Sequence, residues 1–275
     1  MGLIKVLHLL EIGGSVSIMS HFFNKLQAGK SHYIYLKKNK ISSTVSRYYD
    51  GQSFDRFILL IISSFFKSFS YDIIHIHSEE LLIPLFKLTG KKIALHYHGS
   101  DIRESNRSKK RIRSWCRDRA DVIFYNGENM LDRIVNKKNI KKIYLPNPID
   151  TDLFKSNIEK KHGNLILVSS NLDKEKTISE AKKLGPLDII DLDIQQIPYY
   201  FMPKLLSKYE FYSDIKIMPY DPNIKHNLSN TALQALSCGC KVFHNGKEIS
   251  KFPDQSKPET VVKNLLKTYE EILKN

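Results

Sequence analysis

The stretch LPNPIDTDLFKSNIEKKHGN, residues 145–164, separates two series of alternating β-strand and helix patterns. Two prolines and a polar, charged run follow an apolar strand pattern, and a new strand pattern begins at Leu165. Prolines and polar residues in such a run are typical of a connection between domains. We therefore place a domain boundary near residue 150, with an N-terminal domain of residues 1–150 and a shortened C-terminal domain of residues 151–275.

Each half alternates short, β-branched apolar runs with helical patterns. The predicted strands are 5–12, 32–38, 72–78, 91–98, 121–126 and 141–147 in the first half, and 164–170, 187–193, 215–221 and 240–245 in the second. The predicted helices are 17–29, 54–69, 79–89, 103–119, 127–138 and 258–273. Apolar strands separated by helices indicate parallel sheets with helices on both faces. The fold class is therefore α/β: two Rossmann-like, doubly wound domains with an interdomain cleft at the carboxyl ends of both sheets.

Basic residues are concentrated in the first half of the chain. Residues 1–150 carry a net charge of +12 and residues 151–275 a net charge of +2. The densest run is RESNRSKKRIRSWCRDR, residues 103–119. Such a field attracts polyanions, although a solvated helix face is an equally good interpretation. The candidates for contact with an anionic membrane or an acceptor phosphate are Arg103, Arg107, Lys109, Lys110, Arg111 and Arg113.

The longest apolar run is FILLIISSFF, residues 57–66. A bilayer crossing needs about 20 apolar residues, so this run is too short to span. It is either an interfacial helix or a core helix in which Phe57, Leu60, Ile61 and Phe65 fill the first domain. The N-terminal apolar run lacks the features of a signal peptide, so we expect a cytoplasmic protein that associates peripherally with the inner membrane face.

The three cysteines are Cys116, Cys238 and Cys240. Without a secretion signal, an odd number of cysteines indicates reduced thiols. No second pair of ligands accompanies the closely spaced Cys238 and Cys240 at the spacing of a zinc site, so no metal site is expected.

Functional side chains are expected where strands of the first half end. Gly13 and Gly14 follow the first strand, where backbone approaches a ligand closely. The pattern is not G-x-G-x-x-G, which excludes a dinucleotide cofactor. His98 ends the fourth strand and Asp101 follows it, so we expect His98 to donate to a substrate hydroxyl or phosphate and Asp101 to orient it. The alternative for His98 is a core histidine; His77 is a weaker candidate.

In the second half, two helix starts are candidate anion sites. Lys176 lies at the start of a helix, where a cation opposes the helix dipole unless it reaches a bound anion. A solvent-facing lysine is the alternative. Ser229, Asn230 and Thr231 are good N-caps of a later helix whose free N–H groups suit a diphosphate. Gln234 lies one turn further along and can bond a ribose diol.

Several blocks resemble the GT-B glycosyltransferases of the retaining, group 1 (family 4) type. The blocks are YDIIHIHS at 71–78, LHYHGSD at 95–101, RADVIFYNGENM at 119–130, YLPNPIDTDLF at 144–154 and ALQALSCGCKVF at 232–243. The resemblance implies a UDP- or GDP-linked sugar donor in the second domain, an acceptor in the first, and no metal or other cofactor.

Residue by residue, the resemblance makes His98 the histidine near the donor sugar, and it places Gly13 and Gly14 near the diphosphate. Lys176 corresponds to the diphosphate-binding lysine of the R-L-x-x-x-K block. In this sequence Asn171 stands at the arginine position of that block. His226 and Gln234 stand at the two acids of the family's Glu-x7-Glu motif. The positive charge missing at Asn171 weakens stabilisation of the leaving group, an important electrostatic contribution to catalysis, whereas Gln234 can still bond a ribose.

The best-supported function is a retaining hexosyltransferase that acts on a lipid-linked or surface-glycan acceptor. A catalytically inactive, transferase-like partner subunit is the first alternative, because both acids and the arginine are missing. A nucleic-acid-binding protein is suggested only by the net charge of +14, without a binding motif, so no nucleic-acid partner is expected. An epimerase shares the fold, but we find no pair of acid–base carboxylates for it.

Overall fold

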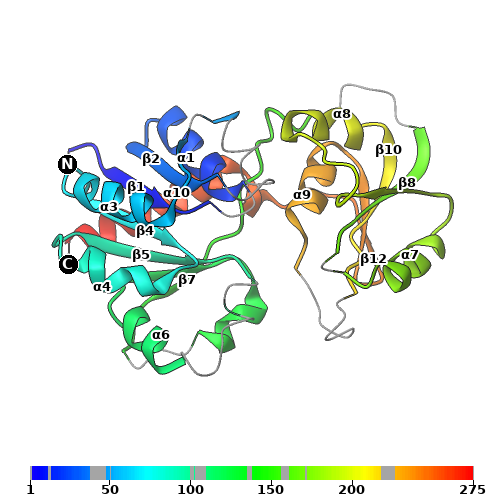
Figure 1. The fold of residues 1–275 in the computed structure, drawn as a ribbon. Helices are drawn as coiled ribbons and strands as arrows, with labels where there is room; N and C mark the ends of the chain where they lie inside the picture. Colours follow the sequence, from blue (N-terminus) through cyan, green and yellow to red (C-terminus); the bar gives the residue numbers. More distant parts are fainter. Residues whose placement is uncertain are drawn as a thin grey trace. The chain divides into compact units, whose positions relative to one another are not determined.

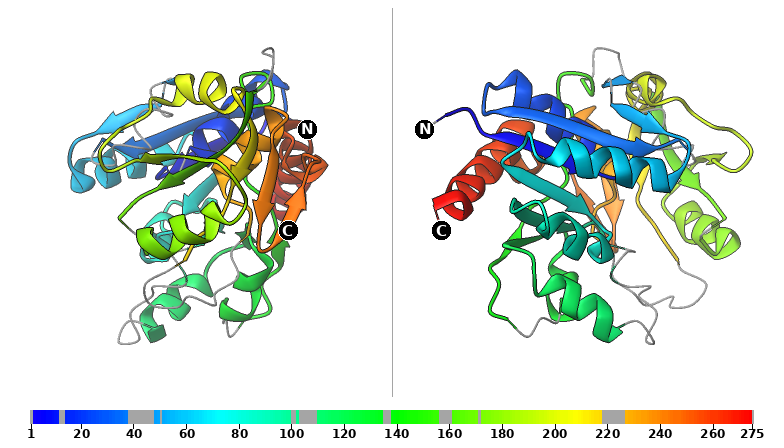
Figure 2. Two further views of the ribbon diagram at one scale, coloured as in Figure 1. Left: turned by 90° about the vertical axis from the view of Figure 1, so that its right-hand side faces the viewer. Right: turned by 60° about the vertical axis from the view of Figure 1, so that its left-hand side comes forward.

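The computed structural model describes residues 2–11, 14–37, 48–49, 51–99, 102, 110–134, 138–155, 161–170, 172–217 and 227–274. The chain forms two compact units: unit 1 contains Met1–Pro148 and Pro258–Asn275, and unit 2 contains Ile149–Lys257. Helix α10 (Pro258–Lys274) belongs to unit 1 because it packs on α1 (Ser15–Lys25). The predicted second domain of residues 151–275 is therefore wrong at its far end, since α10 completes unit 1 (Figures 1 and 2).

Unit 1 contains a seven-stranded parallel sheet with the strand order β3-β2-β1-β4-β5-β6-β7. The strands are β1 (Lys5–Leu9), β2 (Lys30–Leu36), β3 (Gln52–Phe54), β4 (Ile73–His77), β5 (Lys92–Tyr97), β6 (Val122–Tyr125) and β7 (Lys142–Tyr144). All six strands predicted in this half are confirmed. The edge strand β3 was not predicted, because three polar and aromatic residues carry little apolar signal.

Helices cover both faces of this sheet (Figure 1). Besides α1 and α10 they are α3 (Phe57–Ser68), η1 (Glu80–Leu82), α4 (Ile83–Lys87), α6 (Lys110–Arg117) and η3 (Glu128–Arg133). The predicted helix at 127–138 is a short 3-10 helix instead. Leu7, Ile74 and Leu95 of the central strands form one buried core with Leu60 of α3 and Phe86 of α4. The alternate residues of these strands face α1 and α10, and these residues position the candidate site.

Unit 2 contains a five-stranded sheet with the order β12-β11-β10-β8-β9. The strands are β8 (Lys161–Val168), β9 (Leu187–Asp191), β10 (Tyr209–Ser213), β11 (Lys241–His244) and β12 (Lys247–Ile249), of which only β12 pairs antiparallel. The helices are α7 (Lys174–Lys182), η4 (Tyr199–Phe201), α8 (Met202–Leu206), α9 (Asn230–Ser237) and η5 (Asp254–Ser256). Helix α7 packs on β8 and β9, and α9 packs on β10 and β11.

One predicted strand of unit 2 is wrong. The strand β10 occupies Tyr209–Ser213, whereas the prediction was residues 215–221. Ile215 is apolar because it packs on the core beneath α7. The backbone of Ile217 bonds the start of α7, accepting from the N–H of Asp173 and donating to Oγ1 of Thr177. The apolar pattern at 215–217 therefore reflects packing against a helix, and residues 218–221 lie outside the described part.

Candidate active site

Histidines gather on one face of the unit 1 sheet, near the carboxyl ends of three adjacent strands. In register, His8 of β1 lies beside His75 of β4, and His77 of β4 lies beside His96 of β5. His98 follows β5 by one residue and shares this face by the two-residue period of a strand. The first four side chains are fully buried. We call His8, His75, His77, His96 and His98 the histidine face.

Hydrogen bonds link three members of the histidine face in a line. Nδ1 of His8 lies 3.0 Å from Nε2 of His77, and Nδ1 of His77 lies 2.9 Å from Nε2 of His98. Nδ1 of His98 lies 3.2 Å from Oδ1 of Asn147. His75 is outside this line, because its Nδ1 pairs at 2.6 Å with the hydroxyl of Tyr269 on α10. Both ring nitrogens of His98 therefore contact protein groups, and a substrate must displace one of them.

Burial keeps His8, His75, His77 and His96 uncharged at neutral pH. Burial lowers the pKa of His8 to about 3. Burial, reinforced by the neighbouring imidazoles, also lowers the pKa of His75, His77 and His96 well below its ordinary value. Neutral imidazoles are the form that binds metals. Two groups have ring nitrogens within 4.8 Å of one another and could hold an ion: His8 with His75 and His77, and His77 with His96 and His98.

The start of α1 carries a carboxylate that sequence reasoning missed. Gly14 adopts φ of 85°, a left-handed conformation that glycine accepts without strain, and α1 begins directly after it. The buried carboxylate of Glu11 then accepts hydrogen bonds from the N–H groups of Val16 at 3.2 Å and Ser17 at 2.7 Å. An anion at this helix start must compete with Glu11 for these donors. Gly13 itself lies outside the described residues.

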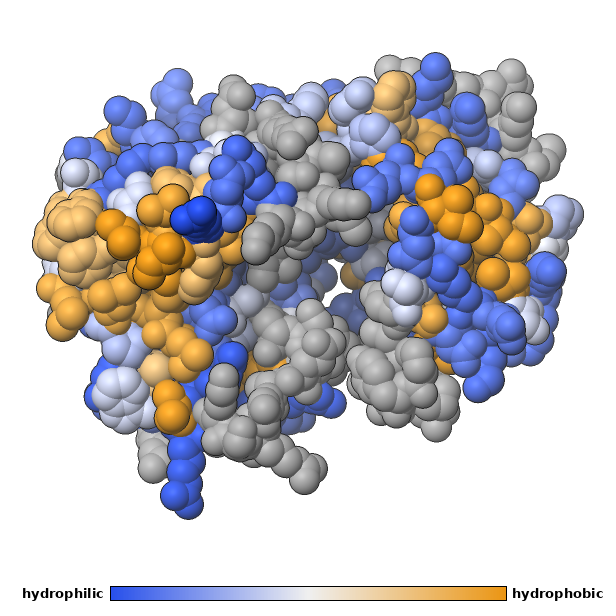
Figure 3. Space-filling view, in the orientation of Figure 1, coloured by the Kyte–Doolittle hydropathy of each residue, from blue (hydrophilic) through white to orange (hydrophobic). Residues whose placement is uncertain are grey.

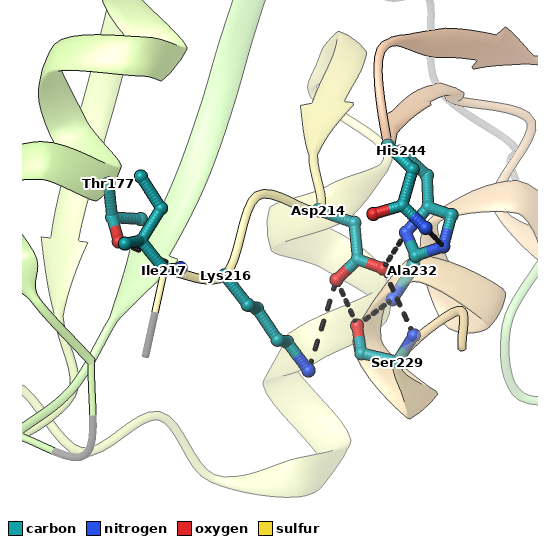
Figure 4. Close-up of polar contacts among 8 residues, drawn as sticks. Thr177, Asp214, Lys216, Ile217, Ser229, Ala232 and His244 are labelled. Atoms are coloured by element: carbon teal, nitrogen blue, oxygen red, sulfur yellow. Dashed lines mark hydrogen bonds and ion pairs between the residues drawn. The ribbon is translucent and has the colours of Figure 1, made fainter. Parts of the chain in front are cut away.

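A second buried carboxylate, Asp214, follows β10 and fixes the start of α9 (Figure 4). Its oxygens accept from Oγ of Ser229 at 2.6 Å, from N of Ser229 at 3.1 Å and from Nδ1 of His244 at 2.9 Å. Burial raises the pKa of Asp214, but the bond from His244, the charge of Lys216 and the bonds from Ser229 together hold it below its ordinary value. Ser229 in turn caps α9 by accepting from the N–H of Ala232 at 3.0 Å.

The predicted donor residues of α9 lie together at its start. Ser229 is the N-cap, as predicted, and Asn230 and Thr231 form the first turn. Gln234 lies one turn further along, and this residue is only 7% exposed. An amide at this depth offers a donor and an acceptor but no charge. His226 of the Glu-x7-Glu positions lies outside the described residues, as does Asn171.

Two lysines at the start of α7 have different surroundings. The side chain of Lys174 is held between Asp191 at 2.6 Å and Asp193 at 2.7 Å, and these bonds raise the pKa of Lys174. Among the residues that the structure describes, Lys176 makes one ion pair, 3.2 Å to Asp173, and its side chain is 70% exposed. The N-cap carboxylate of Asp173 also accepts from the N–H of Lys176.

Part of the predicted basic surface turns into the protein. Arg113 pairs with Glu80 at 3.2 Å, and the neighbouring Arg117 pairs with Glu80 at 3.3 Å and donates to the hydroxyl of Tyr97 at 2.7 Å. Glu80 is buried, so Arg113 neutralises an internal acid, which leaves it less charge to offer a membrane or a phosphate. Arg111 is exposed on α6. Asp101, Arg103, Arg107, Lys109 and the side chain of Lys110 lie outside the described part.

Comparison with known proteins identifies the family. The family model for Glycosyltransferase Family 4 matches residues 9–153, which is more than half of the chain. The chain belongs to glycosyltransferase family 4. The matched segment of this glycosyltransferase contains β4, β5 and the Gly14 turn, whereas His8 of β1 lies just before it. No curated protein matches the chain.

Solved structures show the same fold at low identity. A glycosyltransferase from Rickettsia africae ESF-5 is 11% identical with a TM-score of 0.61, covering 100% of both chains. AviGT4, a glycosyltransferase involved in avilamycin A biosynthesis, is 10% identical with a TM-score of 0.60, covering 98% of both. A UDP-GlcNAc 2-epimerase from Neisseria meningitidis bound to UDP-GlcNAc is 11% identical with a TM-score of 0.50, covering 98% of this chain and 94% of that one. The family 4 protein thus has the GT-B type of fold, with two Rossmann-like units.

Proposed function

We propose that this family 4 glycosyltransferase moves a hexose from a UDP- or GDP-linked donor, with retention, to a lipid-linked or surface-glycan acceptor. Unit 2 is the proposed donor unit and unit 1 the acceptor unit. The observation that carries the proposal is the contrast at the start of α7. Lys174 is held by two carboxylates, whereas among the described residues Lys176 makes one exposed ion pair, which solvent weakens by screening. A diphosphate carries more negative charge than Asp173. Lys176 can therefore exchange its ion pair with Asp173 for an ion pair with the diphosphate.

The proposed assignment of roles follows the two candidate regions. Lys176 binds the diphosphate, and Gln234 bonds the ribose in place of an acid. The N-terminal turn of α9, held by Asp214, lies beside the phosphates, and His98 lies near the transferred sugar. With Lys176 neutralising the leaving diphosphate, the proposed transfer needs no metal.

Heat-unfolding in the presence of UDP- and GDP-sugars tests donor binding. A ligand at 100 times its Kd stabilises a protein by about 2.7 kcal/mol, so one nucleotide should raise the Tm and the other should not. Lys176→Ala should remove the shift. Lys183→Ala is the matched control, because Lys183, the C-cap of α7, is similarly exposed and also makes an i,i+3 ion pair, with Glu180. If Lys176→Ala keeps the full shift, Lys176 does not bind the donor.

A specific observation supports the alternative of an inactive partner subunit: Gln234 is buried where the family pattern has an acid. An inactive subunit can keep the donor site and lose turnover. Measuring the release of free UDP or GDP from the bound nucleotide-sugar distinguishes an active transferase from an inactive subunit, because only an active transferase hydrolyses or transfers the sugar. Donor-dependent stabilisation without nucleotide release favours the partner subunit.

We also propose that α3 docks this protein on an anionic membrane. Leu60 is buried, and Ile61 and Phe65 pack on the core, as the core interpretation predicts, but Phe57 is exposed. The opposite side of α3 is apolar and open, with Ile58, Leu59, Ile62, Phe66 and Phe69 exposed, and Figure 3 shows the apolar area there. Exposed Arg56 and Lys67 stand at its two ends. Among the described residues no helix combines the length and apolar content needed to cross a bilayer.

Sedimentation with vesicles tests this docking. Binding should require anionic lipid and fade with salt, since charges are screened over about 10 Å at 0.1 M. Replacing Ile62 and Phe66 with Glu should abolish binding. Ile194→Glu is the control, because Ile194 of unit 2 is 85% exposed and outside α3. Wild-type protein that stays in the supernatant with anionic vesicles at low salt would exclude the docking.

A further inference from the structure

The two faces of the unit 1 sheet have opposite chemistry. Ile74 and Ile76 of β4 pack into the apolar core, whereas the intervening His75 and the following His77 belong to the histidine face. Burying an imidazole costs free energy unless its nitrogens are bonded. A buried row of imidazoles therefore costs more free energy than a row of leucines unless its nitrogens form hydrogen bonds. The direction of those hydrogen bonds follows from the partner at each end of the row.

The direction follows from the far end of the line. Oδ1 of Asn147 can only accept, so Nδ1 of His98 carries the hydrogen. With His98 neutral, its imidazole has one N–H, so Nε2 of His98 accepts and Nδ1 of His77 donates to it. By the same step, Nε2 of His77 accepts from Nδ1 of His8.

The near end of the line agrees with this direction. Nε2 of His8 is left without a hydrogen, and this buried atom has no hydrogen-bond partner among the described residues. Burial lowers the pKa of His8 and His77, so neither imidazole has a second proton that would reverse the line. All three N–H groups consequently point from the core toward the strand end.

We infer that His77 and His8 are positioning residues, which hold the proton of His98 on Nδ1 and present the ring of His98 at the end of β5 in one fixed orientation. The inference rests on the proposed role of His98 near the transferred sugar. The line acts through hydrogen-bond direction, because each imidazole has its donor nitrogen committed to the next. Replacing His77 by a residue without an N–H releases Nε2 of His98 and frees the ring to turn.

Nuclear magnetic resonance on protein labelled with ¹⁵N in the histidine rings tests this without substrate. Two-bond ¹H–¹⁵N correlations distinguish Nδ1–H from Nε2–H, and single His→Gln variants assign the signals. His8, His77 and His98 should all show Nδ1–H. In His77→Phe, His98 should lose the pure Nδ1–H form. In His77→Asn, whose amide can replace the Nδ1–H donor, His98 should keep it.

Tyr269→Phe is the matched control, because it removes a hydrogen bond from His75 on the same face but outside the line. It should leave His98 in the Nδ1–H form. An Nε2–H form of His98 in the wild type overturns the inference, as does an equal change in Tyr269→Phe. One equivalent of bound metal in the purified protein also overturns it, because a ligated nitrogen neither donates nor accepts.

Enzyme kinetics distinguish a positioning role of His77 from a packing role, because only a positioning role predicts a selective fall in kcat. With the nucleotide-sugar that stabilises the protein, His77→Phe should lower kcat about tenfold, the effect of about one lost hydrogen bond, while KM for the donor stays within about twofold. His77→Asn should recover most of the loss. If no nucleotide-sugar is turned over, the proposed function fails, and the resonance measurement alone still decides the inference.

Discussion

Single buried carboxylates organise both candidate regions. Glu11 occupies the first N–H groups of α1, and Asp214 holds Ser229 and His244 at the start of α9. Neither was singled out from the sequence. In a sequence, an acid beside a strand cannot be distinguished from a surface acid, and only the fold shows that it is buried. Lysines and glycines that lie within family-like blocks can be recognised from the sequence.

Asp214→Asn should destabilise unit 2 by about 3 kcal/mol at pH 7, because breaking a buried charge pair costs about 3–5 kcal/mol. The pKa of Asp214 is lower in the folded than in the unfolded state. Its contribution is therefore complete above the unfolded pKa of about 4 and is lost as the pH falls through the folded value. Hydrogen exchange of the α9 amides measures both effects. Asp188→Asn, which loses an exposed bond to Tyr209, should cost less than about 1 kcal/mol.

Gln234 offers a sharper test of the donor site than any exposed residue. Gln234→Leu keeps the size of the side chain but cannot bond a ribose, so donor-dependent stabilisation should disappear while the protein stays folded. Gln234→Glu restores the acid of the family pattern and should keep or raise transfer. Calorimetric titration with the stabilising nucleotide-sugar measures both variants. Normal donor affinity in Gln234→Leu would assign Gln234 to packing alone.

At the scale of elements, the histidine face makes unit 1 sensitive to acid. Four buried imidazoles are neutral when folded but take up protons when unfolded below about pH 6.5. The unfolded state then binds more protons, so stability falls as the pH falls, by as much as about 5 kcal/mol per pH unit. Fluorescence of Trp115, the only tryptophan and part of α6, reports urea unfolding of unit 1. His8→Phe should reduce the slope by about a quarter.

Helix α10 contributes one large buried side chain to the histidine face. Tyr269 is fully buried, packs edge-on against Phe23 of α1 and bonds His75. Tyr269→Ala should destabilise unit 1 by about 3–5 kcal/mol through the cavity, and Tyr269→Phe by about 1–3 kcal/mol through the unpaired imidazole nitrogen. Thermal unfolding followed by Trp115 measures both. Similar losses in the two variants would mean that the hydroxyl, and not the ring, dominates.

The strands of unit 1 were predictable because parallel strands buried on both faces read as continuous apolar runs. The second unit was harder. Its strand β10, YEFYS, contains a glutamate and a serine and no aliphatic residue, so the more apolar run at 215–221 was predicted as the strand instead. The histidines of β4 and β5 were seen, but a single strand cannot reveal that His77 reaches His8 and His98, since those bonds join three strands.

At the scale of the molecule, the basic residues that give the first 150 residues their positive net charge have more than one role. Arg113 and Arg117 neutralise Glu80 inside unit 1, while Arg56 and Lys67 flank the apolar side of α3. The glycosyltransferase family and the two-unit fold could be anticipated from ordered blocks spread along the chain. The place of α10 could not, because an amphipathic helix pattern does not say which sheet it covers.

Because α10 follows unit 2 in the sequence but packs on unit 1, unit 1 is completed last during synthesis. Residues 149–257 leave the ribosome before residues 258–274, so unit 2 can fold while β1, β4 and β5 still lack the helix that covers their histidines. Until α10 arrives, Phe23 and His75 have no cover from Tyr269, and a nascent chain paused near residue 257 exposes them to chaperones and proteases.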